Sequence, residues 1–158
     1  MYQKILLPLD GSELAECVLP HAESIAKGCG TTSVVLIRVV SPIQVRYDIS
    51  YSLSEPEQEK LYSQAVQHTQ SYLEQVAGRL KEQGLSVTPE VLTGPVAESI
   101  AEYTRKNEID LMIIATHGRS GVSHWVWGSI ADKILRSACV PVLMIRAPGC
   151  IPGIDNSR

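Results

Sequence analysis

The sequence predicts an α/β protein built on an open parallel sheet with helices on both faces. Short apolar runs recur along the 158-residue chain without polar alternation, which is typical of strands that are covered on both faces. Between these runs the apolar residues recur at helical spacing, so strands and helices alternate. Strands joined by helices need right-handed crossovers and therefore form a parallel sheet.

Five segments are expected to be strands. KILLPLD (4–10) comes first and leads into Asp-Gly-Ser. SVTPEVLTG (86–94) is the weakest, because Pro89 cannot donate a hydrogen bond to a neighbouring strand and so favours an edge position. The other three are TSVVLIRVV (32–40), DLMIIAT (110–116) and VPVLMIR (140–146).

The longest of four expected helices runs from about residue 55 to 83. Ser54 and Glu57 have the spacing of a capping box, Pro56 suits the first turn, and Gly84 supplies a stop. The other three are the segment 12–27, the stripe Val96, Ala97, Ile100 and Ala101 behind Gly94-Pro95, and the stripe Ile130, Ala131, Ile134 and Leu135.

The chain has the length of one domain, and no repeat or linker divides it. We expect a domain over 1–147, with a frayed tail rich in Pro and Gly over 148–158. The segment 41–55 is the longest irregular stretch and is expected to be a loop near one end of the sheet.

The composition argues against several classes of protein. A net charge of −3 with scattered Lys and Arg gives no basic surface for nucleic acid. The apolar run at the N-terminus is too short for a signal peptide or a membrane span. The four cysteines lack the close spacing of common zinc sites. We therefore expect a protein of the reducing cytoplasm, with neither nucleic acid nor a membrane as partner.

Two strand ends carry unusual residues. One is Pro8-Leu9-Asp10-Gly11-Ser12, and the other is ATHGRSGVSHWVWGS (115–129). In an open parallel sheet, ligands bind beyond the carboxyl ends of the strands where the strand order reverses. If the first and fourth strands are neighbours, both ends meet at one crevice.

The second strand end has features of an anion site. Gly118 and Gly121 allow backbone amides to approach a phosphate, and Arg119 can add a charge-assisted bond. Ser129, with Asp132 three residues on, resembles the N-cap of the last helix, whose N-terminus attracts anions. Glycine-rich turns before helices are common, so a plain connector is an equal alternative. Asp10 likewise has an alternative role as a turn and helix cap.

At these residues the sequence resembles the universal stress protein family. Nucleotide-binding members carry G-x2-G-x9-G-[ST] after the fourth strand, and here Ala115-Thr-His-Gly118 is followed by nine residues and Gly128-Ser129. Ala115 replaces the first glycine. The similarity extends over KILLPLDGSELAE, IRVVSP, GPVAESIAEYTRKNEIDLMIIATHGRSG and GSIADKILRSACVPVLMIR.

The resemblance implies a five-stranded parallel sheet of order 3-2-1-4-5, which is usually dimeric through the last strand. Val140, Val142 and Met144 alternate along that strand and suit such an edge. It also implies that ATP, or AMP or ADP, binds with Mg²⁺. By this resemblance Pro8 and Val39 would contact the base, and Asp10 the ribose or Mg²⁺. Gly118, Ser129 and the amide of Ile130 would contact phosphate. The other residues of the implied nucleotide site are Leu9, Ala115, Thr116, His117, Arg119, Ser120, Gly121 and Gly128.

Ala115 is the departure from the family pattern that matters most, because some members without the glycine motif do not bind ATP. An alanine would block the site only if the backbone required a positive φ. At a strand end we expect φ to be negative.

Three functions are compatible with the sequence. The first is a nucleotide-binding regulatory protein of stress responses, with at most slow ATP hydrolysis. The second is an ATPase or nucleotidyl transferase, against which stands the lack of an evident general base or paired carboxylates. The third is a nucleotide-free dimer that acts by protein contacts. The sequence assigns no role to Trp125 or Trp127, and it names neither the signal nor the protein partners.

Overall fold

The computed structural model describes residues 1–41, 54–116 and 129–146. Within them, strands and helices alternate as the sequence predicts. The strands form one parallel sheet of order β3-β2-β1-β4-β5, so the expected fold and strand order are confirmed. The elements are β1 (Lys4–Pro8), the 3₁₀ turn η1 (Ala15–Val18), α1 (Leu19–Cys29), β2 (Ser33–Val40), α2 (Glu55–Glu82), β3 (Val87–Thr93), α3 (Val96–Lys106), β4 (Leu111–Ala115), α4 (Ser129–Ser137) and β5 (Val142–Ile145).

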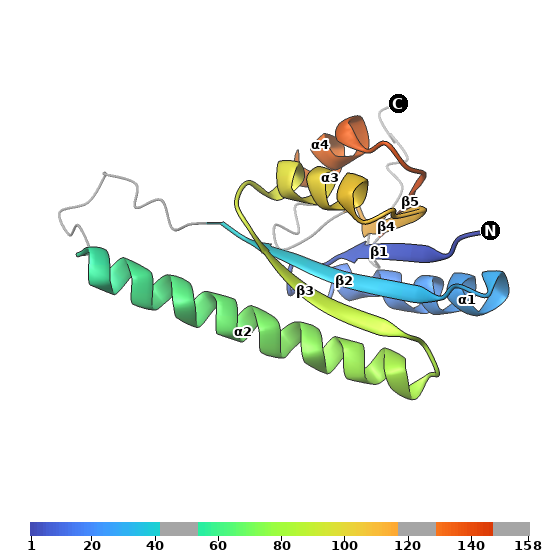
Figure 1. Ribbon diagram of the computed structural model, residues 1–158, viewed down its shortest axis with the longest axis horizontal. Coiled ribbons are helices and arrows are strands. Elements are labelled where there is room, and N and C mark those ends of the chain that lie inside the picture. Colours follow the sequence, from blue (N-terminus) through green and yellow to red (C-terminus); the bar gives the residue numbers. More distant parts are fainter. Residues whose placement is uncertain (42–53, 117–128, 147–158) are drawn as a thin grey trace, which may run out of the picture.

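Helices cover both faces of the sheet, with α1 and α2 on one side and α3 and α4 on the other (Figure 1). Each face has its own apolar core, because successive residues of a strand point to opposite faces. The first core, on the side of α1 and α2, includes Ile5, Leu7, Leu9, Val18, Leu36, Leu73, Val76, Leu80 and Ile113. The second core, on the side of α3 and α4, includes Leu6, Val35, Ile37, Ala97, Ile100, Met112, Ile114, Ala131 and Ile134.

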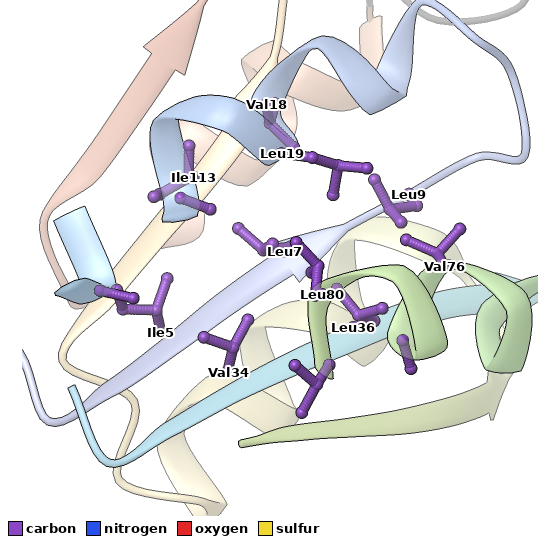
Figure 2. Close-up of a cluster of buried hydrophobic side chains, with 14 of the residues drawn as sticks. Ile5, Leu7, Leu9, Val18, Leu19, Val34, Leu36, Val76, Leu80 and Ile113 are labelled. Atoms are coloured by element: carbon purple, nitrogen blue, oxygen red, sulfur yellow. The ribbon is translucent and has the colours of Figure 1, made fainter. Parts of the chain in front are cut away.

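The first core joins the central strands to helix α2. Leu7 of β1 and Leu36 of β2 are 0% exposed, and Leu80 of α2 is 4% exposed. Figure 2 shows these three side chains converging between the sheet and the helix. Burial on both faces explains why the strands read as unbroken apolar runs in the sequence.

A carboxylate holds the start of β1 beside β4. Oδ2 of Asp110 accepts hydrogen bonds from the backbone N–H groups of Gln3, at 2.7 Å, and Lys4, at 2.8 Å. The N–H of Asp110 in turn donates to the carbonyl of Lys4 at 2.9 Å. These bonds fix the register in which Ile5 faces Leu111.

The expected helix over 12–27 is wrong at its start. The chain forms the short turn η1 first, and α1 begins only at Leu19. Pro20 explains the difference. A proline has no N–H, so it suits the first turn of a helix but would break a hydrogen bond inside a helix that began at residue 12.

Helix α2 begins and ends as the sequence predicts. The backbone N–H and the hydroxyl of Ser54 donate to Oε2 of Glu57 at 2.9 and 2.6 Å, which lowers the pKa of Glu57. After the helix, Gly84 has a φ of +84°. The first half of the helix extends beyond the sheet (Figure 1), and its buried residues begin at Thr69. None of the helices in the described ranges is long and apolar enough to cross a membrane.

The position of Pro89 is also confirmed, because β3 is an edge strand of the described sheet. Pro89 pairs with Leu36 of β2, the only strand that β3 meets there. A residue without an N–H is tolerated at such an edge, because an edge strand forms backbone hydrogen bonds with a neighbouring strand on one side only.

Truncating the first core tests this packing. We expect Leu36→Ala to lower the free energy of unfolding by about 2–5 kcal/mol, because it removes buried methyl groups and leaves a cavity. The matched control is Leu61→Ala, since Leu61 lies on α2 and is 41% exposed. This control should change stability by less than about 0.5 kcal/mol. Urea denaturation measures both, and equal losses would contradict the assignment of the core.

Candidate functional site

The carboxyl ends of β1 and β4 lie side by side in the middle of the sheet. β1 pairs with β4 through Leu6 and Met112, and with β2 through Pro8 and Ile37. From β1 the strand order runs to β2 and β3 on one side and to β4 and β5 on the other. This is the reversal of order at which open α/β sheets bind ligands. The condition for a shared crevice is therefore met.

Pro8, Val39 and helix α4 all belong to the side of the sheet that faces the second core. Pro8 is buried and follows the alternation set by Leu6, which packs in the second core. Val39 of β2 is partly buried and packs against the same core. Helix α4 contributes Ala131 to it. The two expected base contacts thus share a face with the helix expected to bind phosphate.

Helix α4 begins at Ser129, which is the first residue of the helix rather than its flanking cap. Asp132, expected to complete the cap motif, instead forms an ion pair with Arg136, with 2.9 Å between Oδ2 and Nε. Ile130 is 46% exposed in the first turn. The first four N–H groups of a helix have no acceptor within the helix, so this turn can donate to an anion.

Asp10 organises a tight turn after β1. Its Oδ1 accepts from the N–H of Ser12 at 2.9 Å and from the hydroxyl of Ser12 at 2.6 Å. The hydroxyl of Ser12 then accepts from the N–H of Ala15 at 3.2 Å. Neither η1 nor α1 has a side-chain cap hydrogen bond, so the cap role that the sequence offered is not seen, but the turn role is present. It does not exclude ligand binding, because a carboxylate has about four acceptor positions.

Ala115 does not have the positive φ at which its side chain would block the site. Glu108 is the only non-glycine residue of the described ranges with a positive φ, so the expected ordinary backbone of Ala115 is confirmed. Its methyl group packs in the first core, on the face opposite Pro8 and Val39. The alanine side chain therefore points away from the expected base contacts.

The backbones of Leu9 and Thr116 continue the hydrogen bonding of the sheet beyond β1 and β4. The Leu9 side chain is 4% exposed and lies in the first core, so it does not line the same face as Pro8. The N–H of Leu9 donates to Ile37 at 2.8 Å, and that of Thr116 donates to Ile145 at 2.9 Å. The remaining site residues expected from the sequence lie outside the described residues, namely His117, Gly118, Arg119, Ser120, Gly121 and Gly128, as do Trp125 and Trp127.

Arg38 is a residue of this region that sequence reasoning missed. It is half-buried in β2, and its guanidinium lies against Gly11, in the turn made by Asp10. The signal was a single cation inside the apolar run VVLIRVV. A charged side chain in a strand that is covered on both faces needs polar or charged partners. The sequence could have singled out Arg38 for this reason.

Tyr72 of α2 lies beneath Arg38, with 5.7 Å between the guanidinium carbon and the ring centroid. The buried hydroxyl of Tyr72 has no hydrogen-bond partner of normal geometry among the described residues. Burial raises the pKa of Tyr72 strongly, the nearby carboxylates of Glu16 and Asp10 raise it further, and Arg38 opposes them. The carboxylates of Glu16 and Asp10 and the guanidinium of Arg38 thus all act on the Tyr72 hydroxyl.

The strand expected to form a dimer is at the other edge of the described sheet. β5 pairs with β4 alone. Val140, Val142 and Met144 are partly buried against the second core, whereas Leu143 is 36% exposed. Among the described residues, β5 has a strand neighbour on one side only.

Solved structures resemble this fold closely. The structure of the hypothetical protein MJ0577, a universal stress protein of Methanocaldococcus jannaschii, superposes with a TM-score of 0.80 at 23% identity, over 94% of this chain and 99% of that one. A universal stress protein in complex with cAMP gives 0.64 at 18% identity, over 92% and 98%. A universal stress protein family protein of Arabidopsis thaliana with AMP bound gives 0.62 at 15% identity, over 93% of each chain.

Sequence similarity identifies the family. Universal stress protein MJ0531 of Methanocaldococcus jannaschii is 30% identical over 151 residues, which span 94% of this chain and 84% of the relative. The model of the universal stress protein family matches residues 1–146, a range that includes every described residue. The chain belongs to the universal stress protein family.

Proposed function

We propose that this protein binds an adenine nucleotide, ATP or AMP or ADP, with Mg²⁺ at the carboxyl ends of β1 and β4. The observation that carries the proposal is the placement of Pro8, Val39 and helix α4 on one face of the sheet, beside the Asp10 turn and at the reversal of strand order. An elongated ligand with an apolar ring and an anionic end fits this order of surfaces.

The base would lie against Pro8 and Val39. Both are apolar, and Val39 keeps part of its surface exposed at the end of β2. Purine rings have apolar faces, and ligand sites bury such faces against hydrophobic side chains while a few polar groups fix orientation. The first polar side chain beyond Pro8 is Asp10, which would contact the ribose.

The phosphates would lie at the start of α4. The N–H groups of Ser129 and Ile130 belong to the first turn, where the helix dipole favours negative charge. The sequence motif adds Gly118 and Arg119. Asp10 supplies the hard oxygen ligand that Mg²⁺ prefers, and this metal usually binds through one or two carboxylates together with phosphate oxygens.

Two findings support nucleotide binding despite the alanine at position 115. The methyl group of Ala115 points into the first core, and its φ is not positive. In addition, two proteins of similar fold were solved with cAMP and with AMP. Both ligands carry adenine, which is the part that we assign to Pro8 and Val39.

We further propose a regulatory role in the stress response of the cytoplasm, with at most slow ATP hydrolysis. Nucleotide occupancy would change the surface offered to protein partners, and a homodimer would form through the edge strand that contains Val142 and Met144, with Val140 beside it. Such an arrangement needs binding and release of the ligand, and a general base is not required.

A titration of the purified protein with ATP and Mg²⁺ tests the proposal. Gly128→Val should weaken binding at least about tenfold, because the branched side chain would occupy the volume that the motif leaves for phosphate. The matched control is Gly28→Val, since a Cβ at Gly28 in α1 meets nothing within 4 Å. Isothermal calorimetry gives the affinities. No binding by the wild type at millimolar ATP would refute the proposal and favour a nucleotide-free dimer.

Asp10→Asn separates the ligand role of this residue from its structural role. The amide oxygen of Asn can still accept from the N–H and the hydroxyl of Ser12, so the turn should persist. The lost charge should weaken binding of ATP with Mg²⁺ by about ten- to a hundred-fold, the range typical of a change that disturbs metal ligation. Glu102→Gln, which removes a charge from an exposed ion pair on α3, is the control. Equal affinities for Asp10→Asn and wild type would restrict Asp10 to shaping the turn.

A further inference from the structure

Arg38 reaches across from β2 to the turn that follows β1. An added Cβ on Gly11 would lie 2.8 Å from Cζ and 3.2 Å from Nη2 of Arg38, and closer still to Nη1. The guanidinium therefore occupies the space that a side chain at position 11 would need. Gly11 also has a φ of +83°, which glycine adopts without strain. The absence of a side chain at Gly11 therefore lets the guanidinium of Arg38 lie close to the backbone of the Asp10 turn.

Helix α2 holds the guanidinium in place from below. The ring of Tyr72 lies 5.7 Å from the guanidinium carbon, within the range of a cation–π contact. Arg79, seven residues further along the same helix, binds Glu16 of η1 with 2.6 Å between Nη2 and Oε2. Arg38 thus links the Asp10 turn to α2, whereas the pair of Arg79 and Glu16 links α2 only to η1, after the turn.

We propose that Arg38 is a positioning residue for the nucleotide site. It holds the Asp10–Gly11 turn in the position in which the Asp10 carboxylate contacts the ligand. Arg38 lies on the face of the first core, whereas the proposed base contacts Pro8 and Val39 lie on the other face. It therefore acts through Asp10 and does not touch the base. This inference rests on the proposed function.

The hydrogen bonds inside the turn do not by themselves place it on the sheet. Asp10 and Ser12 bond to each other, so these bonds can move together as one unit. The bond from the N–H of Leu9 to the carbonyl of Ile37 fixes the last residue before Asp10. Arg38 adds the contact just beyond it, at Gly11. A planar guanidinium can stack on a ring and support a peptide at the same time, which the ammonium group of a lysine cannot do.

The experiment compares Arg38→Ala and Arg38→Lys with the wild type and with Arg79→Ala. The last variant removes an exposed ion pair of α2 that does not reach Gly11. Calorimetry with ATP and Mg²⁺ should give a loss of affinity of about ten- to a hundred-fold for Arg38→Ala, as for residues that orient a ligand group from behind. Arg38→Lys should recover part of this loss, and Arg79→Ala should stay within about twofold of wild type.

A second readout separates positioning from general destabilisation. Because Arg38 acts through Asp10, Arg38→Ala should cause little further loss of affinity when Asp10→Asn is already present. In the nucleotide-free protein, the amide of Ser12 should exchange its hydrogen faster in Arg38→Ala than in Arg79→Ala. If Arg38→Ala does not fold, Arg38→Lys carries the same comparisons.

Each outcome decides the matter. Affinity of Arg38→Ala within twofold of wild type, or an additive loss in the double variant, would overturn the inference while nucleotide binding stands. If the wild type binds no adenine nucleotide, the proposed function fails. The hydrogen exchange of the Ser12 amide then tests by itself whether Arg38 holds the turn. An exchange rate in Arg38→Ala equal to that in Arg79→Ala would show that Arg38 does not hold it.

Discussion

The central constraint of this structure is the position of β1 between β2 and β4. Every residue of β1 after Lys4 is buried, so the strand has little freedom to shift without opening both cores. The Asp110 carboxylate binds the backbone at its start, and the pairing with Ile37 continues to Leu9 at its end. The chain must then leave the sheet at Asp10, next to the end of β4. The candidate site is a consequence of this placement.

At this end of the molecule, the two faces of the sheet carry residues with different proposed roles. On the side of the second core lie Pro8, Val39 and the start of α4, the groups that we assign to the ligand. On the other side, Arg38 and Tyr72 support the turn. Alternation of side chains along each strand makes this division, because neighbours such as Arg38 and Val39 must point in opposite directions.

The sequence was sufficient to predict the fold, but it did not predict the contact that supports the Asp10 turn. Apolar runs and helical stripes are local patterns, and they identified the strands, the capping box at Ser54 and the edge position of Pro89. The start of α1 was misplaced because the periodicity of 12–27 outweighed Pro20. The contact between Arg38 and Gly11 joins residues far apart in the chain, and no local pattern states what lies across a sheet. The ligand roles of all the expected site residues stay predictions, and those between 117 and 128 lie outside the described residues.

The most direct test of nucleotide binding at this edge is the mapping of backbone amide NMR signals during a titration with ATP and Mg²⁺. The account predicts that the signals of Asp10, Gly11, Val39, Thr116 and Ile130 shift together and saturate at one ligand per chain. Signals at the opposite ends of the strands, such as Lys4 and Ser33, should stay unchanged. Shifts confined to β5 or α2, or no shifts at millimolar ATP, would contradict the central claim.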